Sequence, residues 1–266
     1  MSLTVAALEP APLHVVRYRN AARGGGSESA MLPIQRARVH GLPPGLDALI
    51  ATSDLQGIVP DARTRAATLL GCAVAEVLEE LAFDGVVPDA AHTGVLLAGD
   101  LYSVPGADKR GGHGDVAAVW QAFAERFAWV AGVAGNHDDT DRVATSERVR
   151  LLDTESAALH GLTIGGVGKI CGNPEKRGRR AEDDQLERLA LVAALGVEVL
   201  LCHEGPSGGP DQLGHPGIRA VLEEHPVPLT ICGHVHWDQP LAQLPAGQVL
   251  NVDARVVVLV RATYAA

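Results

Sequence analysis

The stretch WVAGVA, residues 129–134, runs directly into GNHD, residues 135–138. A short, uncharged run of apolar and small residues is typical of a strand that is buried on both faces. The polar motif begins where that strand is expected to end. Because open α/β sheets place their functional sites at the carboxyl ends of the strands, we expect Asn136, His137 and Asp138 to lie at such a site.

Four other junctions have the same form, an apolar run followed by a short polar motif. The runs are 48–51, 95–98, 197–201 and 229–231, and the motifs are Ser53-Asp54-Leu55-Gln56-Gly57, Gly99-Asp100, Cys202-His203-Glu204 and Gly233-His234-Val235-His236. If all five strand ends converge, their carboxylate, amide and imidazole groups suffice to bind two metal ions. His234 and His236 are two residues apart, so in an extended segment both rings would face the same way.

Helical patterns separate these strands. Apolar residues recur with a period near 3.6 over residues 63–82, and similar patterns cover 116–127 and 183–195. Strands that alternate with helices predict an α/β fold. Residues 159–167 and 249–260 are rich in β-forming residues, and we expect both to complete a second sheet.

The N-terminal region differs in character from the rest of the chain. We expect residues 1–33 to form a strand and loop appendage packed on the core, and residues 34–266 to form a single domain. Residues 13–18 and 35–39 are candidate strands of one hairpin, and the Gly/Ser-rich stretch 21–29 is expected to be a loop. Segments 103–114, 171–180 and 205–216 are rich in Gly, Pro and charge, and we expect them to form the rim of the site.

Composition narrows the classes of function. The 266 residues carry a formal net charge of −10, which disfavours nucleic acid as a partner because such binding depends on an excess of Lys and Arg. No apolar stretch reaches the roughly 18–20 residues of a membrane span, and a signal peptide is not recognisable, so we expect a cytoplasmic location and no membrane partner. The four cysteines show no C-x-x-C spacing and predict neither a zinc knuckle nor a disulfide framework.

The order of the five motifs resembles that of the calcineurin-like metallophosphoesterases, and the resemblance spans residues 54 to 236. It implies a two-sheet β-sandwich flanked by helices and a centre of two divalent metal ions. One position departs from the pattern. Where the family usually has Asp-x-His-Gly, this chain has Asp54-Leu55-Gln56-Gly57, so that Gln56 stands in place of a histidine.

The resemblance also implies a role for each motif residue. Asp100 would bridge the two ions; Asp54 and His236 would bind the first ion, and Asn136, His203 and His234 the second. His137 would face the substrate, stabilising phosphoryl oxygens or protonating the leaving group, and Asp138 would accept a hydrogen bond from its ring. Mn²⁺ is the expected metal, with Fe, Mg²⁺ and Zn²⁺ as alternatives.

Gln56 suggests that the first metal position is altered. Its amide oxygen offers a neutral ligand in place of a neutral imidazole, and oxygen ligands favour harder ions such as Mn²⁺ or Mg²⁺. Our hypothesis is a weaker, more labile first position at which Gln56 is a ligand or hydrogen-bonds a metal-bound water.

The basic residues of two loops have two possible roles. Lys109 and Arg110 follow the expected bridging aspartate, and Arg177 and Arg180 belong to a basic cluster in the loop at 171–180. They are either solvated loop charges or contacts for an anionic substrate.

The leading functional hypothesis is a two-metal phosphoesterase. It would hydrolyse a small phosphomonoester or phosphodiester, such as a nucleotide, by attack of a metal-bridging hydroxide. A catalytically weak binding module with the same fold is the main alternative, and a nuclease is a third. A homo-oligomer is compatible with the sequence.

Overall fold

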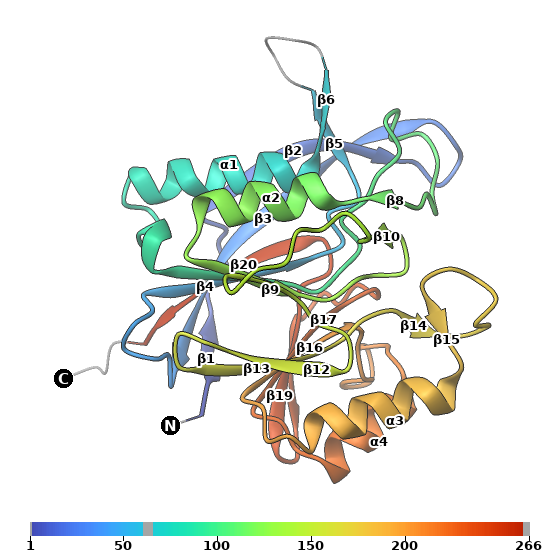
Figure 1. Cartoon of the computed structure of the whole chain (residues 1–266). Helices are drawn as coiled ribbons and strands as arrows, with labels where there is room; N and C mark the ends of the chain where they lie inside the picture. The colour runs from blue at the N-terminus through green and yellow to red at the C-terminus, as the bar shows by residue number, and fades with distance from the viewer. Residues whose placement is uncertain (1, 61–65, 263–266) are drawn as a thin grey trace.

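The computed structural model describes residues 2–60 and 66–262, which fold into four layers (Figure 1). Two β-sheets face each other, and helices cover the outer face of each sheet. This is the helix-flanked two-sheet arrangement that the family resemblance implies.

The first sheet has ten strands. Its order is β11-β9-β7-β4-β20-β3-β2-β5-β6, and β1 pairs with β3. The strands are β1 (Thr4–Leu8), β2 (His14–Ala21), β3 (Ser27–His40), β4 (Ala48–Ser53), β5 (Ile58–Pro60), β6 (Ala67–Leu69), β7 (Thr93–Leu97), β9 (Trp129–Gly132), β11 (Val149–Leu151) and β20 (Arg255–Arg261). Strands β4, β7, β9 and β11 run parallel, so their carboxyl ends share one edge of the sheet.

The second sheet has six strands in the order β12-β13-β16-β17-β19-β18. They are β12 (Glu155–Leu159), β13 (Leu162–Val167), β16 (Val199–Glu204), β17 (Leu229–Gly233), β18 (Leu241–Leu244) and β19 (Gly247–Asn251). Strands β13, β16, β17 and β19 are parallel. Two short pairs lie outside the sheets: β8 (Gly114–Asp115) with β10 (Asp138–Asp139), and β14 (Ile170–Cys171) with β15 (Arg179–Arg180).

Helices α1 (Leu70–Phe83) and α2 (Ala117–Arg126) pack on the first sheet, and α3 (Glu182–Ala193) and α4 (Pro216–Glu224) on the second. A short 3₁₀ helix, η1 (Ala90–His92), precedes β7. One core lies between the two sheets, where Leu49, Leu96, Ile164 and Leu201 are fully buried. Because these side chains come from the parallel strands themselves, burial of the core fixes where the strand ends meet.

All five apolar runs form strands, namely β4, β7, β9, β16 and β17, and the helices expected over 116–127 and 183–195 are confirmed with small shifts of their ends. The helix expected over 63–82 begins only at Leu70, because residues 67–69 pair with β5 as strand β6. Residues 63–65 of that expectation lie outside the described part of the chain. Helix α4 was not expected; Pro216 in its first turn and the His215 ring, which accepts from two backbone N–H groups, mark its start.

Residues 249–260 do not all join the second sheet, which corrects the expectation for this segment. Strand β19 pairs with β17 in the second sheet, whereas β20 lies between β3 and β4 in the first. Ala254, with φ of 49°, lies between the two strands. Alternation along a strand specifies which face is buried but not which sheet receives it, so the crossover was invisible in the pattern. Residues 159–167 likewise form the end of one strand, a turn at His160-Gly161 and a second strand.

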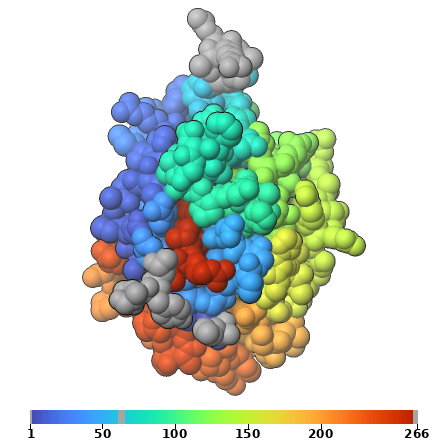
Figure 2. Space-filling model, turned by 90° about the vertical axis from the view of Figure 1, so that its left-hand side faces the viewer, coloured from blue at the N-terminus to red at the C-terminus, as the bar shows by residue number. Residues whose placement is uncertain are grey.

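The N-terminal segments are built into the first sheet. Strand β3 is continuous across residues 33 and 34, where we expected a boundary, and the turn of the β2–β3 hairpin covers only residues 22–26. The expected hairpin exists in a different register: β2 pairs with residues 27–34, while residues 37–40 pair with β1. In Figure 2 the red C-terminal segment lies against blue N-terminal segments, which agrees with the pairing of β20 with β3 and β4.

The N-terminal hairpin also reaches the functional edge of the sheet. The ring of Tyr18 on β2 covers Gly57, where a Cβ atom would overlap with the ring. Gly57 ends the Asp54–Gly57 motif, so the hairpin packs directly on one of the five polar motifs. Among the described residues, no helix is long and apolar enough to cross a membrane.

Candidate metal centre

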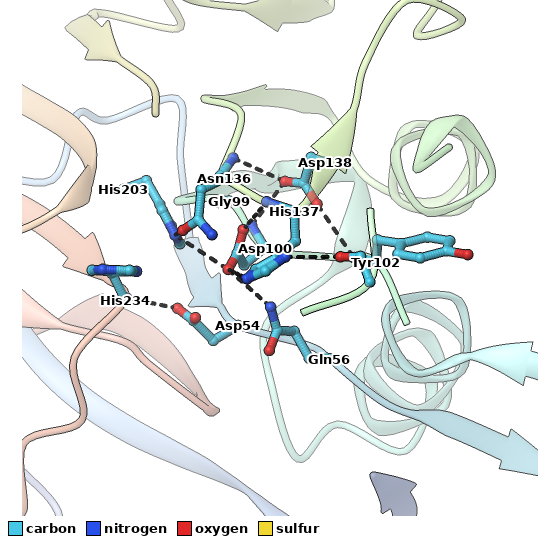
Figure 3. Close-up of polar contacts among 12 residues, drawn as sticks. Asp54, Gln56, Gly99, Asp100, Tyr102, Asn136, His137, Asp138, His203 and His234 are labelled. Carbon is cyan, nitrogen blue, oxygen red and sulfur yellow. Dashed lines mark hydrogen bonds and ion pairs between the residues drawn. The ribbon is translucent and has the colours of Figure 1, made fainter. Parts of the chain in front are cut away.

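Side chains from all five strand ends converge between the two sheets (Figure 3). Asp54 follows β4, Asp100 follows β7, and Asn136 follows β9; from the second sheet, His203 lies on β16 and His234 follows β17. The expected convergence of the carboxyl ends is therefore observed.

Three of these residues form a tight group of ligand atoms. One atom each from Asp100, His203 and His234 lies within 4.8 Å of the other two. The side-chain oxygen of Asn136 lies 3.2 Å from Nε2 of His203. A carboxylate, an amide oxygen and two imidazoles are a donor set that fits a divalent transition ion.

The backbone at the centre is held in an uncommon conformation. Asp54 and Asp100 each have a φ of 55°, and His234 has a φ of 70°. A residue other than glycine in this left-handed region costs on the order of 1–3 kcal/mol, and such strain concentrates at functional sites. In all three cases the strained residue directs its side chain toward the centre (Figure 3).

Two glycines allow the strand ends to approach each other. A Cβ atom on Gly135 would overlap with Oδ1 and the backbone nitrogen of Asp100, and one on Gly233 would overlap with Ser53 and with Oδ2 of Asp54. The glycine before each polar pair is therefore a packing requirement of the site.

His203 is fully buried and its ring is oriented by the backbone. Its Nδ1 lies 2.8 Å from the Ala98 carbonyl oxygen, an acceptor, so Nδ1 carries the proton. Nε2 then faces Asp100, with 3.4 Å to Oδ2. Burial alone would lower the pKa of His203, but Asp100 and Asp54 raise it to about 10. The carboxylates around this ring thus stabilise a positive charge at this position, whether it is carried by a proton or by a metal ion.

The carboxylates respond differently to the same surroundings. Removal from water, together with repulsion from Asp253, raises the pKa of Asp54 well above its usual range. Burial also acts to raise the pKa of Asp100, but His203 and His137 lower it overall. Asp100 is therefore the carboxylate that is poised to stay ionised at the middle of the group.

Asp138 does not contact the His137 ring, which corrects the expected pairing. Its two oxygens accept hydrogen bonds from the backbone N–H groups of Asp100, Leu101, Tyr102 and Gly135, at 2.7 to 3.2 Å. Burial and the nearby Asp100 raise the pKa of Asp138 to about 6. Asp138 braces the two loops that carry Asp100 and Asn136, since unpaired N–H groups at strand ends attract a buried carboxylate.

His137 lies at the edge of the centre. Its Nδ1 lies 2.8 Å from the Gly112 carbonyl oxygen, and its Nε2 lies 3.9 Å from Oδ2 of Asp100. The carbonyl of Gly112, in the loop after β7, therefore takes the orienting role that we had assigned to Asp138.

His236 is not in the group that His234 joins. Strand β17 ends at Gly233, and the positive φ of His234 ends the extended conformation on which the alternation argument relied. The His236 ring instead contacts Asp253, with 3.2 Å between Nδ1 and Oδ1, and Arg255, with 3.2 Å between Nε2 and Nη2.

Gln56 points into the centre with its amide nitrogen. Nε2 donates a hydrogen bond of 2.8 Å to Oδ2 of Asp100 (Figure 3). We expect from the sequence that Gln56 is either a metal ligand or hydrogen-bonds a metal-bound water; in the structure its amide nitrogen is a donor to the central carboxylate.

A cavity of about 350 Å³ opens beside the centre. It lies between the β2–β3 hairpin and the loop after β7, and its walls include Asp54, Gln56, His137, His234, Lys109 and Arg110. Arg110 links the two walls, because its Nε donates to the Ala21 carbonyl oxygen at 3.2 Å. Both basic residues of this loop are therefore placed where an anionic ligand would enter.

The other two basic candidates do not line this cavity. Arg177 lines a separate cavity of about 510 Å³, whose walls also include Gly135 and Asp138 beside the centre. Arg180 is buried, paired with Asp153 and hydrogen-bonded to Gln185 and to the Gly168 carbonyl oxygen. This structural pairing uses the Arg180 guanidinium, so Arg180 is not available to bind substrate.

Sequence reasoning missed three residues at the site, namely Asn20, Asp253 and Arg255. Asn20 and Asp253 line the cavity, and Oδ1 of Asn20 is a buried side-chain oxygen without a hydrogen-bond partner among the described residues. Only the alternation of polar residues at Asn251, Asp253 and Arg255 offered a signal in the sequence, and it did not distinguish a site from a strand edge.

Comparison with known proteins agrees with this geometry. Among curated proteins, none matches the chain. A solved structure, that of the protein TT1561 of Thermus thermophilus, shares the fold, with a TM-score of 0.54 at 19% sequence identity, over 79% of this chain and 90% of that one. The sequence profile of the calcineurin-like phosphoesterases matches residues 49–238. This range contains all five polar motifs and most of the chain, which therefore belongs to the calcineurin-like phosphoesterase family.

Proposed function

We propose that this protein hydrolyses phosphate esters of small molecules with the help of divalent metal ions held at Asp100, Asn136, His203 and His234. The observation that carries this proposal is the group of Asp100, His203 and His234, whose ligand atoms lie within 4.8 Å of one another beside an open cavity. A divalent ion bound there supplies positive charge that polarises a phosphoryl oxygen and lowers the pKa of water.

The cavity supports a small substrate. About 350 Å³ is at the lower end of the range that small-molecule sites occupy. Its rim carries Lys109 and Arg110, which would bind the non-bridging oxygens or a second anionic group of the ester. A negative net charge of −10 over the whole chain argues against a long polyphosphate backbone as the substrate.

His137 is the proposed acid for the leaving group. Since Nδ1 is held by the Gly112 carbonyl, the ring is fixed in orientation and Nε2 remains for a proton exchange at the cavity wall. Proton transfer of this kind contributes roughly 100- to 10,000-fold to a rate. Asp138 acts indirectly, by holding the backbone of Asp100 and Gly135.

Mn²⁺ is the proposed metal because the group mixes oxygen and imidazole ligands. Asp54, to which the resemblance assigns a further ion, also lines the cavity. Monoesters and diesters both remain candidate substrates.

An assay of metal-stripped protein tests the function. It compares p-nitrophenyl phosphate with bis-p-nitrophenyl phosphate, with Mn²⁺, Mg²⁺, Fe²⁺ or Zn²⁺ added back. We expect turnover that depends on the metal and disappears in Asp100→Ala, with the circular dichroism of the variant unchanged. Turnover that survives Asp100→Ala contradicts the assignment. The absence of hydrolysis of both esters with every metal favours a binding module with this fold.

A further inference from the structure

We infer that this chain binds one divalent ion tightly, at Asp100, Asn136, His203 and His234, and that Gln56 and Arg255 keep the neighbouring position from assembling. This neighbouring position, called the second position from here on, is the one to which the resemblance assigns Asp54 and His236. The inference rests on the proposed function of the same site. It concerns the number of ions, which is measured without reference to turnover.

The first part of the inference follows from preorganisation of one ligand set. Asp100, Asn136 and His203 are 2%, 9% and 0% exposed, so their side chains have little freedom to leave the centre. The Ala98 carbonyl holds the proton on Nδ1 of His203 and leaves Nε2 for a metal. Ligands that are already oriented by the protein bind a metal without a cost for ordering them.

Asp100 has two of its roughly four lone-pair positions already occupied, because each of its oxygens accepts a hydrogen bond. Oδ1 accepts the backbone N–H of His137 at 2.8 Å, and Oδ2 accepts the side-chain N–H of Gln56 at 2.8 Å. A bridging carboxylate must offer a lone pair to each of two ions. Gln56 places a hydrogen, which carries partial positive charge, where a ligand of the second ion would be needed.

Arg255 affects the other proposed ligand of that position, His236. Its Nη2 lies 3.2 Å from Nε2 and 3.5 Å from Nδ1 of the His236 ring. Arg255 is itself buried, with 6% of its surface exposed, and Nη2 also donates to the Trp237 carbonyl oxygen at 2.5 Å. An ion bound to His236 would have to displace a fixed guanidinium or lie against its positive charge.

The charges around the centre point the same way. Asp54, Asp100 and Asp253 supply three carboxylates, and Asp138 is already satisfied by four backbone N–H groups. A second divalent ion would add positive charge beside a guanidinium that already neutralises part of the acidic cluster.

Asp54 is also engaged by the protein. Its Oδ2 accepts hydrogen bonds from Ser53 Oγ at 2.5 Å and from the His234 backbone N–H at 2.9 Å. These bonds involve one oxygen of Asp54, so the contacts that oppose an ion at the second position are those of Gln56 with Asp100 and of Arg255 with His236. The physical content of the Gln56 departure is a loss of one metal position.

Metal-free wild-type protein titrated with Mn²⁺ tests the inference, with calorimetry for affinity, elemental analysis for content and electron paramagnetic resonance for coupling between ions. We expect one tight equivalent and the signal of an isolated Mn²⁺ ion. Two equivalents with affinities within tenfold of each other, or the signal of a coupled pair, would overturn it.

Repair of the second position gives the converse test. Gln56→His combined with Arg255→Gln should add a second equivalent, with an affinity at least about tenfold higher than any weak second binding in the wild type. Gln56→His alone leaves the contacts of Arg255 intact and serves if the double variant does not fold. Gln121→His, on the exposed surface of α2, is the matched control and should leave the stoichiometry at one. If neither repaired variant gains affinity, Gln56 and Arg255 are not what suppresses the second position.

The outcomes separate this inference from the proposed function. One bound ion without hydrolysis of any ester leaves the inference standing and removes the function. Two ions bound with similar affinity, together with ester hydrolysis, would contradict the inference and support the proposed function. A protein that binds no Mn²⁺ would contradict both.

Discussion

The side-chain nitrogen of Gln56 lies 2.8 Å from Oδ2 of Asp100 and joins two strand ends that carry the candidate metal centre. In a site built for two ions, that carboxylate would be surrounded by metal. Here a protein N–H group supplies part of the positive charge, so the centre combines hydrogen-bond donors with ligands. Packing, bracing and charge together produce this arrangement, and substitutions can test each of them separately.

Gly135→Ala should disable the centre by displacing Asp100. The added Cβ atom would overlap with the carboxylate and the backbone nitrogen of Asp100, a buried residue. Overpacking of this kind costs about 1–3 kcal/mol of folding free energy, and we expect ester hydrolysis to fall at least about 100-fold because a displacement of about 1 Å has that effect. Gly45→Ala, with nothing within 4 Å of the new atom, is the control for kinetics and urea unfolding. Normal metal affinity in Gly135→Ala would contradict the packing argument.

Asp138→Asn should destabilise the protein and weaken metal binding together. The amide would direct two N–H groups at backbone donors, where the carboxylate now accepts from Asp100, Leu101, Tyr102 and Gly135. We expect a loss of about 2–4 kcal/mol in free energy of unfolding, since buried donors would lose a charged acceptor. Asp139→Asn, at the neighbouring and less buried position, should cost well under half as much.

Comparison of kcat with the unfolding midpoint and the Mn²⁺ affinity of the variant separates a bracing role of Asp138 from a catalytic role. If Asp138→Asn lowered kcat while the unfolding midpoint and Mn²⁺ affinity stayed at wild-type values, Asp138 would act in the chemistry and not through the backbone.

Arg110→Gln should weaken substrate binding without changing the chemical step. Arg110 lines the cavity and reaches across to the Ala21 carbonyl oxygen, but it contacts none of the proposed ligands. We expect KM for an anionic aryl phosphate to rise roughly 3- to 10-fold at nearly constant kcat, the pattern of lost uniform binding. Arg177→Gln, in the separate cavity, should leave both constants unchanged. Equal effects of the two substitutions would indicate a general effect of net charge.

Arg180→Met should affect stability and leave KM unchanged. The buried guanidinium pairs with Asp153 and hydrogen-bonds Gln185 and the Gly168 carbonyl oxygen. Because Asp153 is partly exposed, we expect a loss of roughly 1–3 kcal/mol, below the full cost of breaking a buried pair. Chemical denaturation measures this loss, and Arg179→Met is the neighbouring control. A selective rise in KM for Arg180→Met would make Arg180 a substrate contact after all.

Several features of the fold were legible in the sequence because they depend on local pattern. The five apolar runs all became strands, and the helices at α2 and α3 agreed with their 3.6-residue period. Where the local pattern was ambiguous, the expectation was wrong: the periodic stretch before Leu70 is strand β6, held by its pairing with β5. Pairing is a tertiary event, so propensity alone could not place that boundary.

The residues of the site also divide into those that a local pattern predicted and those that it did not. His203 and His234 follow directly from their motifs, since each lies in or next to a strand whose direction the fold determines. His236 did not, because the turn at His234 rotates the following residues toward Asp253 and Arg255. These two partners belong to a segment that joins one sheet to the other, and the periodicity of that segment carried no sign of the crossing.

Strand direction and residue type are local properties of the chain, so they were sufficient to predict the family, the class of fold and the identities of the side chains that gather at the strand ends. What each side chain does there became apparent only in the folded molecule. The tertiary structure assigned Gln56 and Arg255 as donors, made Asp138 a brace, and placed Lys109 and Arg110 at the mouth of a cavity that the N-terminal hairpin helps to form. The physical reason is that hydrogen-bond partners and the local balance of charge arise from segments brought together from both ends of the chain, and no pattern within one segment specifies them.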